Sequence, residues 1–560
     1  MVQTPQVTQG YRTCPVTGLL CHIATLRLIT ANYVMALISI SIGGIAAIFV
    51  GLSRSSLVLL RDPGSYYLWL TAHGINMLLF WILWFEVALL YFVGTVLLNA
   101  PIYSVRIGWI AFALMLTGWA FVEYSVFSGN ASVLFTAYPP LTAHPIFYAG
   151  YVIYVLGAGL AVITFFLTLY RARVEGRYRG SLPLVTWGAA IAAIIAVTVV
   201  IHGLISLAYV AFWLAGSLPL NVMIYRWYFW GLGHDAQYVN VTAMVAVWYA
   251  LLALSTGLAA VKFINERYAR IAFAMYVLFV IPGIGHHILV DPGFSTAFKQ
   301  ASGSVGSHFL SIPSMLHALA LLGGLEALLR ASGYSKGLLS WLKAIPWSNP
   351  GASGLLLSML LFGIGGIVAQ PQTTLQPNLL FHNTMWVPAH FHSTVVGGTT
   401  LAFMALSYYL IPLITLRRIF NMSMARIQIY LAFIGILTMI LSMNVLGWLG
   451  APRRTLVLPE DFAEHTAWIA PATALGVGAL IFIASGVMYV LNMILTILAG
   501  KRTADPKILM DGLMSSYEIK DPSAAKKTGS LVIVVIFLVV VLLALYFASF
   551  IRLLSLPPIW

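Results

Sequence analysis

Long apolar runs recur along the whole 560-residue chain and are separated by short polar loops. A helix needs about 20 apolar residues to cross the hydrocarbon layer of a membrane. By that length, the pattern predicts thirteen membrane-spanning helices, which make one all-α integral membrane domain over residues 28–553. An N-terminal segment, 1–27, and a short tail, 554–560, flank it. The predicted spans begin near Leu28, Tyr67, Ile107, Ile146, Leu184, Tyr225, Ala269, Ser307, Gly351, Thr384, Gln428, Ala467 and Leu531.

Basic residues collect in the loops on one side of the predicted bundle. The loops after the fourth, sixth, eighth, tenth and twelfth spans each hold two or more arginines or lysines, whereas residues 128–145 on the other side hold none. Because cytoplasmic loops are enriched in basic residues, this bias predicts a cytoplasmic N-terminus and an outer C-terminus. Arg453 and Arg454 break the pattern, since they lie in an outer loop.

The composition excludes a water-soluble protein. Only 8% of the residues are charged and 61% are hydrophobic, whereas soluble domains carry about 25% charged residues. The basic loops account for the formal net charge of +14, and no basic face is left to bind nucleic acid. The two cysteines, Cys14 and Cys21, precede the first span. Together with His22 they do not complete a metal site, so they form a terminal disulfide or remain two free thiols.

Six of the thirteen histidines lie inside the predicted spans in a pattern that indicates function, because an ionisable side chain in a membrane is costly. His390 and His392 lie two residues apart at the start of the tenth span. Positions i and i+2 of a helix point about 200° apart, so these imidazoles can bind two different metals. His73, near the start of the second span, lies at a similar depth and is a candidate for a second ligand to one of them.

The other three histidines of the pattern lie toward the same side of the membrane. They are His234 in the sixth span and His286 and His287 at the end of the seventh. Imidazole suits iron and copper, and axial histidines are common in haem sites. Tyr238 follows His234 by four residues and shares its helix face. A lone membrane histidine such as His202 is explained more simply by a hydrogen bond to a neighbour.

Together these residues resemble the catalytic subunit of haem–copper oxygen reductases, from the first span to the last. The motifs that carry the resemblance are TAHG at His73, GHDAQY at His234, HH followed by DPG at His286, HNTMWVPAHFH at His390 and APRR at Arg453. Any one of these motifs is weak evidence, but the joint pattern is specific.

The resemblance implies two haems and one copper ion. The implied ligands are His73 and His392 for a low-spin haem, His390 for a high-spin haem, and His234, His286 and His287 for the copper ion that faces it.

Further residues take implied roles around these cofactors. Tyr238 would be joined covalently to His234 and would supply an electron and a proton when the O–O bond breaks. Arg453 and Arg454 would pair with haem propionates through charge-assisted hydrogen bonds, and His382 would contact a propionate as well.

Two departures from the commonest members, the A family, make the chain resemble the B family. The position two residues after His234 holds Ala236 instead of a carboxylate, and the loop LLNAPIYSVRI after the second span has no acidic residue. A single proton channel is then expected, with Tyr249, Ser314 and His317 as its candidate residues.

Four other positions are unusual for the family. Asp235 replaces a common proline; it either handles protons or is a solvated residue near a helix end, and the second interpretation is favoured. Asn378 replaces a common acidic residue. Glu86 and Glu123 are carboxyl groups within spans; the resemblance assigns them no role, and burial favours their neutral form.

The implied function is that of a terminal respiratory oxidase that reduces O2 to water in the plasma membrane of a bacterium or archaeon. Electrons would come from cytochrome c, a blue-copper protein or quinol. Protons would come from the cytoplasm, and further protons would be pumped. The implied partners are subunit II, small accessory membrane subunits, the electron donor and the lipid membrane.

Three alternatives compete with this function. A nitric oxide reductase of the same superfamily needs glutamates near a non-haem iron and lacks the linked tyrosine, so Tyr238 and Ala236 argue against it. A proton-coupled secondary transporter would use the histidines as a relay and bind no haem; the lack of a convincing internal repeat argues against one built from two related halves. A purely structural subunit does not explain six matching ligand positions.

Overall fold

The structure is a computed structural model that describes residues 7–8, 10–526 and 528–556. Among these residues, twelve helices are long and apolar enough to cross a membrane, and a thirteenth is counted if a helix pair bent by 53° forms one span. The predicted helical membrane bundle is confirmed, with a small N-terminal sheet in addition. The side that each terminus faces stays a prediction, as do the boundaries of the two end segments. Residues 1–6, 9 and 557–560 of those segments lie outside the described residues.

Each predicted span corresponds to one helix or to a run of consecutive helices. In chain order the spans are α1 (Ile23–Ser53); α2 (Pro63–Ile75), η1 (Asn76–Phe80) and α3 (Trp81–Thr95); α4 (Val105–Phe127); α5 (Pro145–Val174); α6 (Leu184–Leu214); α7 (Val222–Ser255); α8 (Glu266–Phe279) and η3 (Pro282–Ile288); α9 (Thr296–Phe298), η4 (Lys299–Gly306) and α10 (Ser307–Ala331); α11 (Pro350–Thr373); α13 (Trp386–Phe391), η6 (His392–Thr400) and α14 (Leu401–Thr415); α15 (Met422–Trp448); η7 (Thr466–Trp468) and α17 (Ile469–Ala499); and η8 (Pro522–Lys526) with α19 (Ser530–Ser555).

Short elements connect the spans. The connecting helices are η2 (Ala259–Phe263), η5 (Ser340–Ala344), α12 (Leu375–Phe381), α16 (Pro459–Glu464) and α18 (Pro506–Leu509). The strands β1 (Val7–Thr8), β2 (Tyr11–Thr13) and β3 (Leu20–His22) pair in that order as an antiparallel sheet.

Polar side chains define where several of these apolar helices begin. The side chain of Asn221 accepts hydrogen bonds from the backbone nitrogens of Met223 and Ile224 at the start of α7. Asn349 caps α11 in the same way, directly before Pro350. Such caps satisfy backbone N–H groups that the first helical turn leaves free.

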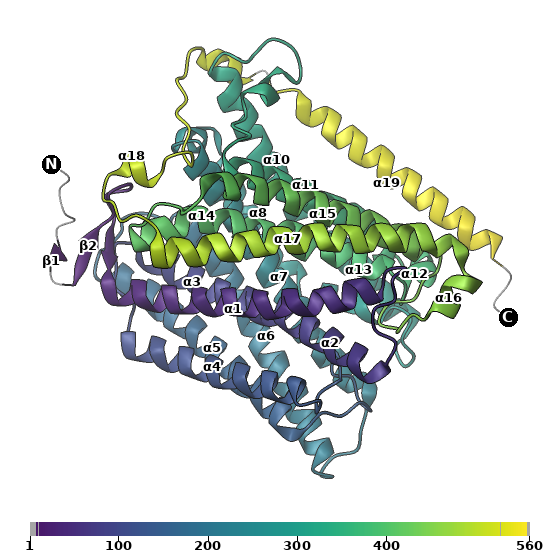
Figure 1. Ribbon diagram of the computed structural model, residues 1–560. Coiled ribbons are helices and arrows are strands. Elements are labelled where there is room, and N and C mark those ends of the chain that lie inside the picture. Colours follow the sequence, from purple (N-terminus) through teal and green to yellow (C-terminus); the bar gives the residue numbers. More distant parts are fainter. Residues whose placement is uncertain (1–6, 9, 527, 557–560) are drawn as a thin grey trace.

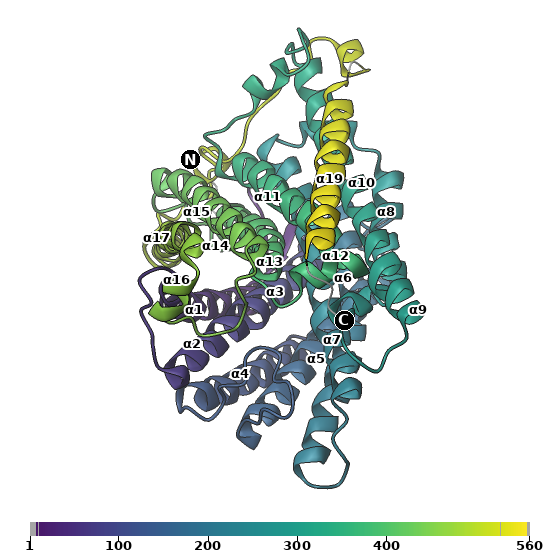
Figure 2. The same cartoon turned by 90° about the vertical axis from the view of Figure 1, so that its right-hand side faces the viewer.

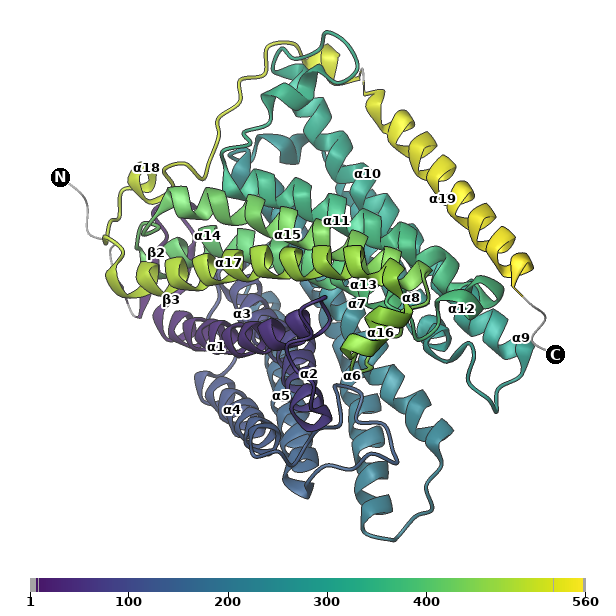
Figure 3. The same cartoon turned by 45° about the vertical axis from the view of Figure 1, so that its right-hand side comes forward.

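The span α13–η6–α14 lies at the centre of the bundle and α19 at its edge. All of the apolar window of α13–η6–α14 is buried, whereas none of the window of α19 is. Figures 1 and 3 show α19 diverging from the other helices, and in Figure 2 it lies in front of α10 and α11. The N-terminal sheet and the far end of α19 lie at opposite ends of the bundle (Figure 1), as an odd number of spans requires.

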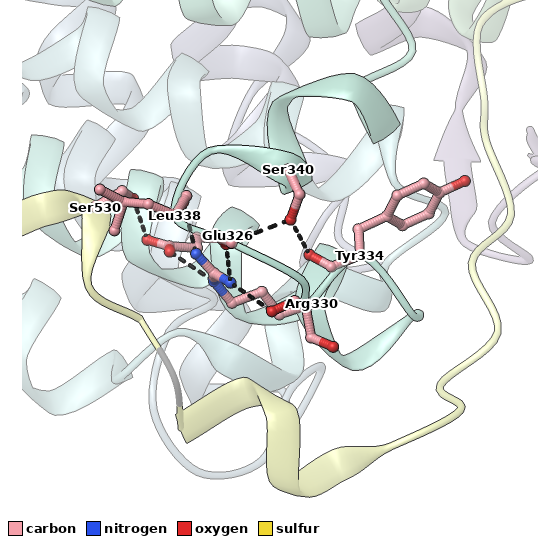
Figure 4. Close-up of polar contacts among 8 residues, drawn as sticks. Glu326, Arg330, Tyr334, Leu338, Ser340 and Ser530 are labelled. Atoms are coloured by element: carbon pink, nitrogen blue, oxygen red, sulfur yellow. Dashed lines mark hydrogen bonds and ion pairs between the residues drawn. The ribbon is translucent and has the colours of Figure 1, made fainter.

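A buried ion pair joins the start of α19 to α10 (Figure 4). Arg330 Nε lies 2.7 Å from Glu326 Oε1, and both side chains are almost fully buried. Ser530 Oγ donates to the other carboxylate oxygen over 2.5 Å. The guanidinium of Arg330 also donates to the carbonyl oxygens of Ser335, Gly337 and Leu338, so one cation orders both the helix pair and the adjacent loop.

A second contact holds α19 nearer to its other end. The hydroxyl of Tyr546 donates to the carbonyl oxygen of Gln370 over 2.9 Å and lies 2.7 Å from the hydroxyl of Thr374. The helix is therefore attached through polar groups at two points, with lipid-facing apolar residues between them.

We expect Glu326→Gln to destabilise the protein by about 3–5 kcal/mol, because removing one partner of a buried ion pair leaves the charge of the other uncompensated. A lower midpoint of thermal unfolding in detergent would show this. The matched control is Asp511→Asn, which breaks the exposed pair between Arg418 and Asp511 (2.9 Å) and should cost at most about 1 kcal/mol. Equal shifts in the two variants would contradict the expectation.

Cys21 lies in β3 and Cys14 directly follows β2. Both are buried free thiols, so the free-thiol form is the one present. Arg12 anchors the sheet to the end of α14 by donating to the carbonyl oxygens of Leu413 (2.8 Å) and Ile414 (2.7 Å). Burial, and then the nearby Cys14, raise the pKa of the Cys21 thiol from 9.0 to about 11.

The pH dependence of alkylation should report this shift. Only the thiolate reacts, and two pKa units change the thiolate fraction about 100-fold at pH 8. In the Cys14→Ser variant, the rate at which iodoacetamide modifies Cys21 should rise about tenfold per pH unit. It should still be rising at about pH 10, where a thiol with a pKa of 9.0 is already mostly thiolate. Mass spectrometry measures the rate, and unfolded protein is the control. A rate that levels off at about pH 10 in the folded protein, as in the unfolded protein, would exclude the raised pKa.

Candidate active site

A cavity of about 810 Å³ lies inside the bundle and is bounded by α2, α7, η3, α13, η6 and one side of α19. Its walls are mostly apolar, with a few polar groups that converge on it, which is typical of a cofactor site. The structure brings all six predicted histidines to this cavity: His73, His234, His286, His287, His390 and His392. Tyr238, Arg453 and Arg454 also line it.

The two spans that carry the candidate haem ligands His73, His390 and His392 change from α-helix to π-helix beside the cavity. The π-helical turn η1 begins three residues after His73, and η6 begins at His392. A π-turn holds one more residue than an α-turn, which redirects the following side chains, and such turns are frequent at functional sites. Close packing accompanies the change: a Cβ atom on Gly365 of α11 would come within 2.6 Å of Thr394 Cγ2 in η6.

The imidazoles of His73 and His392 face each other across part of the cavity. Their ring centroids are 6.3 Å apart and their planes differ by 17°. His73 Nδ1 bonds to the carbonyl oxygen of Gly43 (3.1 Å) and His392 Nδ1 to that of Pro388 (2.8 Å). A carbonyl only accepts, so each Nδ1 carries the proton and each Nε2 keeps a free lone pair. The separation leaves room for one metal bound by both rings, with metal–nitrogen bonds of about 2 Å.

His390 is oriented by the same kind of bond. Its Nδ1 donates to the carbonyl oxygen of Gly365 over 3.0 Å, so its Nε2 is also left with a free lone pair. A backbone carbonyl bonded to the other ring nitrogen is the usual support of a metal-binding histidine. His390 and His392 thus retain separate partners, as expected for ligands of two different metals.

His234, His286 and His287 form a second group. One ring nitrogen of each lies within 4.8 Å of the others. His286 Nδ1 donates to the Gly283 carbonyl (2.8 Å), and His234 Nε2 to that of Val280 (3.1 Å). His234 Nδ1 then faces His287 Nε2 at 3.3 Å. Three imidazoles form a donor set that suits copper, iron, nickel or zinc.

Aromatic rings fix this group from outside. The indole of Trp230 stacks on His287 with centroids 3.7 Å apart and planes within 3°. The Tyr238 ring lies 4.9 Å from that of His234, tilted by 45°. The predicted neighbourhood of Tyr238 and His234 is present, whereas Trp230 carried no signal in the sequence beyond its position one turn before His234.

Arg453 and Arg454 bring positive charge to the cavity. The loop that carries them is held by Arg54, which donates to the carbonyl oxygens of Pro452 and Thr455. Within the described part of the chain, neither Arg453 nor Arg454 forms an ion pair. Burial, and then the charge of Arg454, lower the pKa of Arg453 to about 9. Two adjacent cations without a carboxylate fit an acidic group of a bound cofactor.

His382 lies near these arginines and is not part of the cavity wall. Burial, and then the charges of Arg453, Arg226 and Arg454, lower the pKa of His382 to about 4. Arg54 was not singled out from the sequence, although it is another cation on the side that is otherwise poor in basic residues.

A family model described as "Cytochrome C and Quinol oxidase polypeptide I" matches residues 27–481. The chain belongs to this family.

Individual proteins that are similar to this chain are oxidase subunits of the same kind. Cytochrome c oxidase subunit 1 of Thermus thermophilus is 29% identical over 414 residues, which are 72% of this chain and 71% of the relative. The Synechocystis subunit of the same name is 23% identical over 466 residues, or 79% and 78%. A solved haem–copper terminal oxidase dimer shares the fold, with a TM-score of 0.77 and 24% identity over 94% of this chain and 92% of that one.

As a member of the cytochrome c and quinol oxidase polypeptide I family, the chain is subunit I of a haem–copper oxygen reductase. It is a multi-pass membrane enzyme of the respiratory chain that binds haem and copper and assembles with a subunit II. The residues present fit both kinds of cofactor, because three imidazoles converge on one point and unpaired arginines lie beside an apolar cavity with paired histidines.

The three predicted channel residues of this oxidase subunit lie close to a fourth polar residue, Tyr276, which the sequence analysis does not identify. Tyr249 lies within hydrogen-bonding distance of His317 (OH to Nδ1, 3.0 Å), and Ser314 is in the same relation to Tyr276 (2.8 Å). The ring of Tyr276 stacks on that of His317 and lies 6.3 Å from Tyr238. Tyr276 is on the buried face of α8, so helical spacing along that amphipathic span could have identified it.

The favoured interpretation of Asp235 is wrong. Asp235 lies within α7 and is fully buried, not solvated at a helix end. Thr198 on α6 donates to its carboxylate over 2.6 Å, and His202 Nδ1 lies 3.6 Å from the same oxygen. Asp235 lies on the face of α7 that packs against α6, so its carboxylate contacts protein instead of solvent.

Replacing His287 with alanine should remove the metal bound by the three-imidazole group, because two imidazoles hold a metal far more weakly than three. We expect copper measured by mass spectrometry in the purified oxidase subunit to fall at least tenfold. The control is His465→Ala, an exposed histidine outside the cavity, which should leave copper unchanged. Full copper in His287→Ala would exclude its assignment as a ligand.

Proposed function

We propose that this subunit reduces O2 to water between a haem held by His390 and a copper ion held by His234, His286 and His287. The proposal depends above all on the arrangement of these imidazoles: they line one cavity, and hydrogen bonds to backbone carbonyls leave ring nitrogens free on His390, His286 and His234. When bound, the haems and copper supply electron transfer and the position at which O2 binds.

A second haem is held by His73 and His392. The near-parallel rings and their 6.3 Å separation support a bis-histidine site. Arg453 and Arg454 bind the acidic groups of the haems, and the nearby His382 contacts one of them. Charge-assisted hydrogen bonds of this kind are stronger than neutral ones, and the arginines therefore orient a cofactor in an otherwise apolar cavity.

Tyr238 holds a proton at its phenolic oxygen beside His234. In the mature enzyme the two side chains are covalently linked, and Tyr238 contributes an electron and its proton when the O–O bond is broken. The contacts of Tyr249 with His317 and of Ser314 with Tyr276 support a single proton channel that leads to Tyr238 from the cytoplasm. Pumping of further protons accompanies the reaction.

The subunit is a B-family oxidase in the plasma membrane of a bacterium or archaeon. Ala236 is buried at the position where the A family has a carboxylate, which supports this assignment. Small accessory membrane subunits join subunit II in the complex. The electron donor is cytochrome c, a blue-copper protein or quinol, and oxygen uptake measured with each donor in turn distinguishes them.

The nitric oxide reductase alternative requires glutamates at the second metal. Within the described residues, the group of possible metal ligands at this point consists of three histidines and no carboxylate. The composition of the group therefore favours copper and oxygen reduction.

The decisive measurement is a visible spectrum of the dithionite-reduced complex with and without carbon monoxide. We expect bands from two haems, of which carbon monoxide shifts only one, because one iron has two histidine ligands and the other has an open position. In His390→Ala the carbon monoxide response should disappear while the bis-histidine bands remain. In His73→Ala the bis-histidine bands should disappear while the carbon monoxide response of the other haem remains.

The control is again His465→Ala, which should keep both sets of bands. A complex that contains subunit II but shows no haem bands would refute the proposed function. Bands of two haems that both respond to carbon monoxide would refute the assignment of His73 and His392 as a pair.

A further inference from the structure

Two carboxyl groups lie inside the bundle without a role in the proposed reaction. Glu86 on α3 is 5% exposed and Glu123 on α4 is 8% exposed. Among the described residues, no ion pair involves either carboxyl. An ionised carboxylate without a cation is very costly in such surroundings, so both groups are held as neutral acids.

Glu86 is connected to the cavity through two amides. The Asn240 amide has one terminal atom 2.9 Å from Glu86 Oε1 and the other 3.0 Å from Gln237 Oε1. Gln237 in turn lines the cavity beside Tyr238. These contacts form a continuous polar connection from α3 to the cavity, and it does not include Tyr249 or His317.

The carbonyl of Ala236 determines the orientation of the Asn240 amide. A carbonyl oxygen only accepts, so the amide atom 3.1 Å from it is Asn240 Nδ2, which donates. The same Nδ2 donates to Glu86 Oε1 over 2.9 Å, and Asn240 Oδ1 then faces the Gln237 amide at 3.0 Å. Glu86 accepts this bond at Oε1 and can keep its proton on Oε2, which has no hydrogen-bond partner among the described residues.

Glu123 has a similar environment near the bis-histidine pair. Asn76 Nδ2 donates to Glu123 Oε1 over 2.8 Å, and Asn76 lies three residues after His73 at the start of η1. The hydroxyl of Tyr151 on α5 interacts electrostatically with Glu123, and that of Tyr154 with Glu86 and Tyr151.

Several atoms of this group have no hydrogen-bond partner among the described residues. They are Glu86 Oε2, Glu123 Oε2, Asn76 Oδ1 and the hydroxyl oxygens of Tyr151 and Tyr154. Buried polar atoms are almost always hydrogen-bonded in native proteins, and internal water commonly provides the bond. Five such atoms on four helices within one region indicate a site for water molecules between the two acids.

We propose that Glu86 and Glu123, with internal water, form a proton-holding site that communicates with the active-site cavity through Asn240 and Gln237. The proposal rests on the proposed function, since oxygen reduction in the cavity supplies the change in charge to which the site responds. A proton leaves the carboxyl O–H of Glu86 for water in the cavity. The O–H bond re-forms with a proton from the internal water, which at the same time takes a proton from the carboxyl O–H of Glu123, so that Glu123 is left as the carboxylate until it is protonated again. No electron is transferred at either carboxyl.

Infrared difference spectroscopy of the complete enzyme, oxidised minus reduced, tests this directly. The wild-type spectrum should contain a carbonyl-stretching band of a protonated carboxylic acid that shifts in D2O. Glu86→Gln should lose that band, because glutamine keeps the hydrogen bonds of the side chain but holds no exchangeable carboxyl proton. Glu86→Asp should retain a band at a shifted frequency. Glu123→Gln should alter or remove part of the signal.

The matched control is Glu464→Gln, which changes an exposed carboxyl at the end of α16 and should leave the bands as in the wild type. The reduced and carbon monoxide spectra of each variant establish that both haems are present. Haem bands without any carboxyl signal that depends on Glu86 or Glu123 would overturn the proposal and leave the proposed function intact. Absence of the haem bands from the wild-type enzyme would overturn the proposed function itself.

Discussion

The orientation of the active-site histidines depends on hydrogen bonds from imidazole to backbone carbonyls. The Nδ1–H groups of His73, His390 and His392 each donate to such a carbonyl, and this leaves the opposite nitrogen of each ring free in the cavity. In a membrane these bonds are not in competition with water, so they fix the rings firmly. The carbonyls that bind His73 and His390 belong to Gly43 on α1 and Gly365 on α11, so the close approach of neighbouring helices orients these two rings. The carbonyl that binds His392 belongs to Pro388 in the same span.

Charge is distributed around the cavity in a consistent way. Among the residues that the structure describes, Arg453 and Arg454 have no carboxylate partner, and Glu86 and Glu123 have no cationic partner. This separation agrees with the roles proposed above, in which the arginines bind the acids of a cofactor and the carboxyls hold protons. A direct ion pair between an arginine and a carboxyl would occupy both groups.

Much of the fold is predictable from the sequence, because each span must contain about 20 apolar residues. Such a run locates the span and gives the approximate depth of each of its residues in the membrane. The spacing of His390 and His392 likewise predicts that they face different partners. Spacing along one helix does not show which residues of other helices pack against it. The solvent-exposed position predicted for Asp235 is wrong for this reason, because one amino-acid sequence does not show that Thr198 on α6 packs against it.

Local departures from regular α-helix are also not predictable from the sequence. The π-helical turns at η1 and η6 depend on contacts with other helices, such as the close approach of Gly365, and no residue pattern marks them. Helical spacing along α8 could have identified Tyr276 as a buried residue, but its contacts with Ser314 and His317 on α10 appear only in the folded bundle. The sequence identifies polar residues that are costly to bury in a membrane. It does not determine which neighbouring residues form hydrogen bonds with them.

The position of α19 has a consequence for how the cavity is closed. Its residues Val534, Leu538 and Leu542 form part of the cavity wall, yet none of its apolar window is buried. On this side the cavity is therefore separated from the hydrocarbon of the membrane by a single lipid-facing helix, and the side chains of that one helix determine how well the cavity is insulated from lipid.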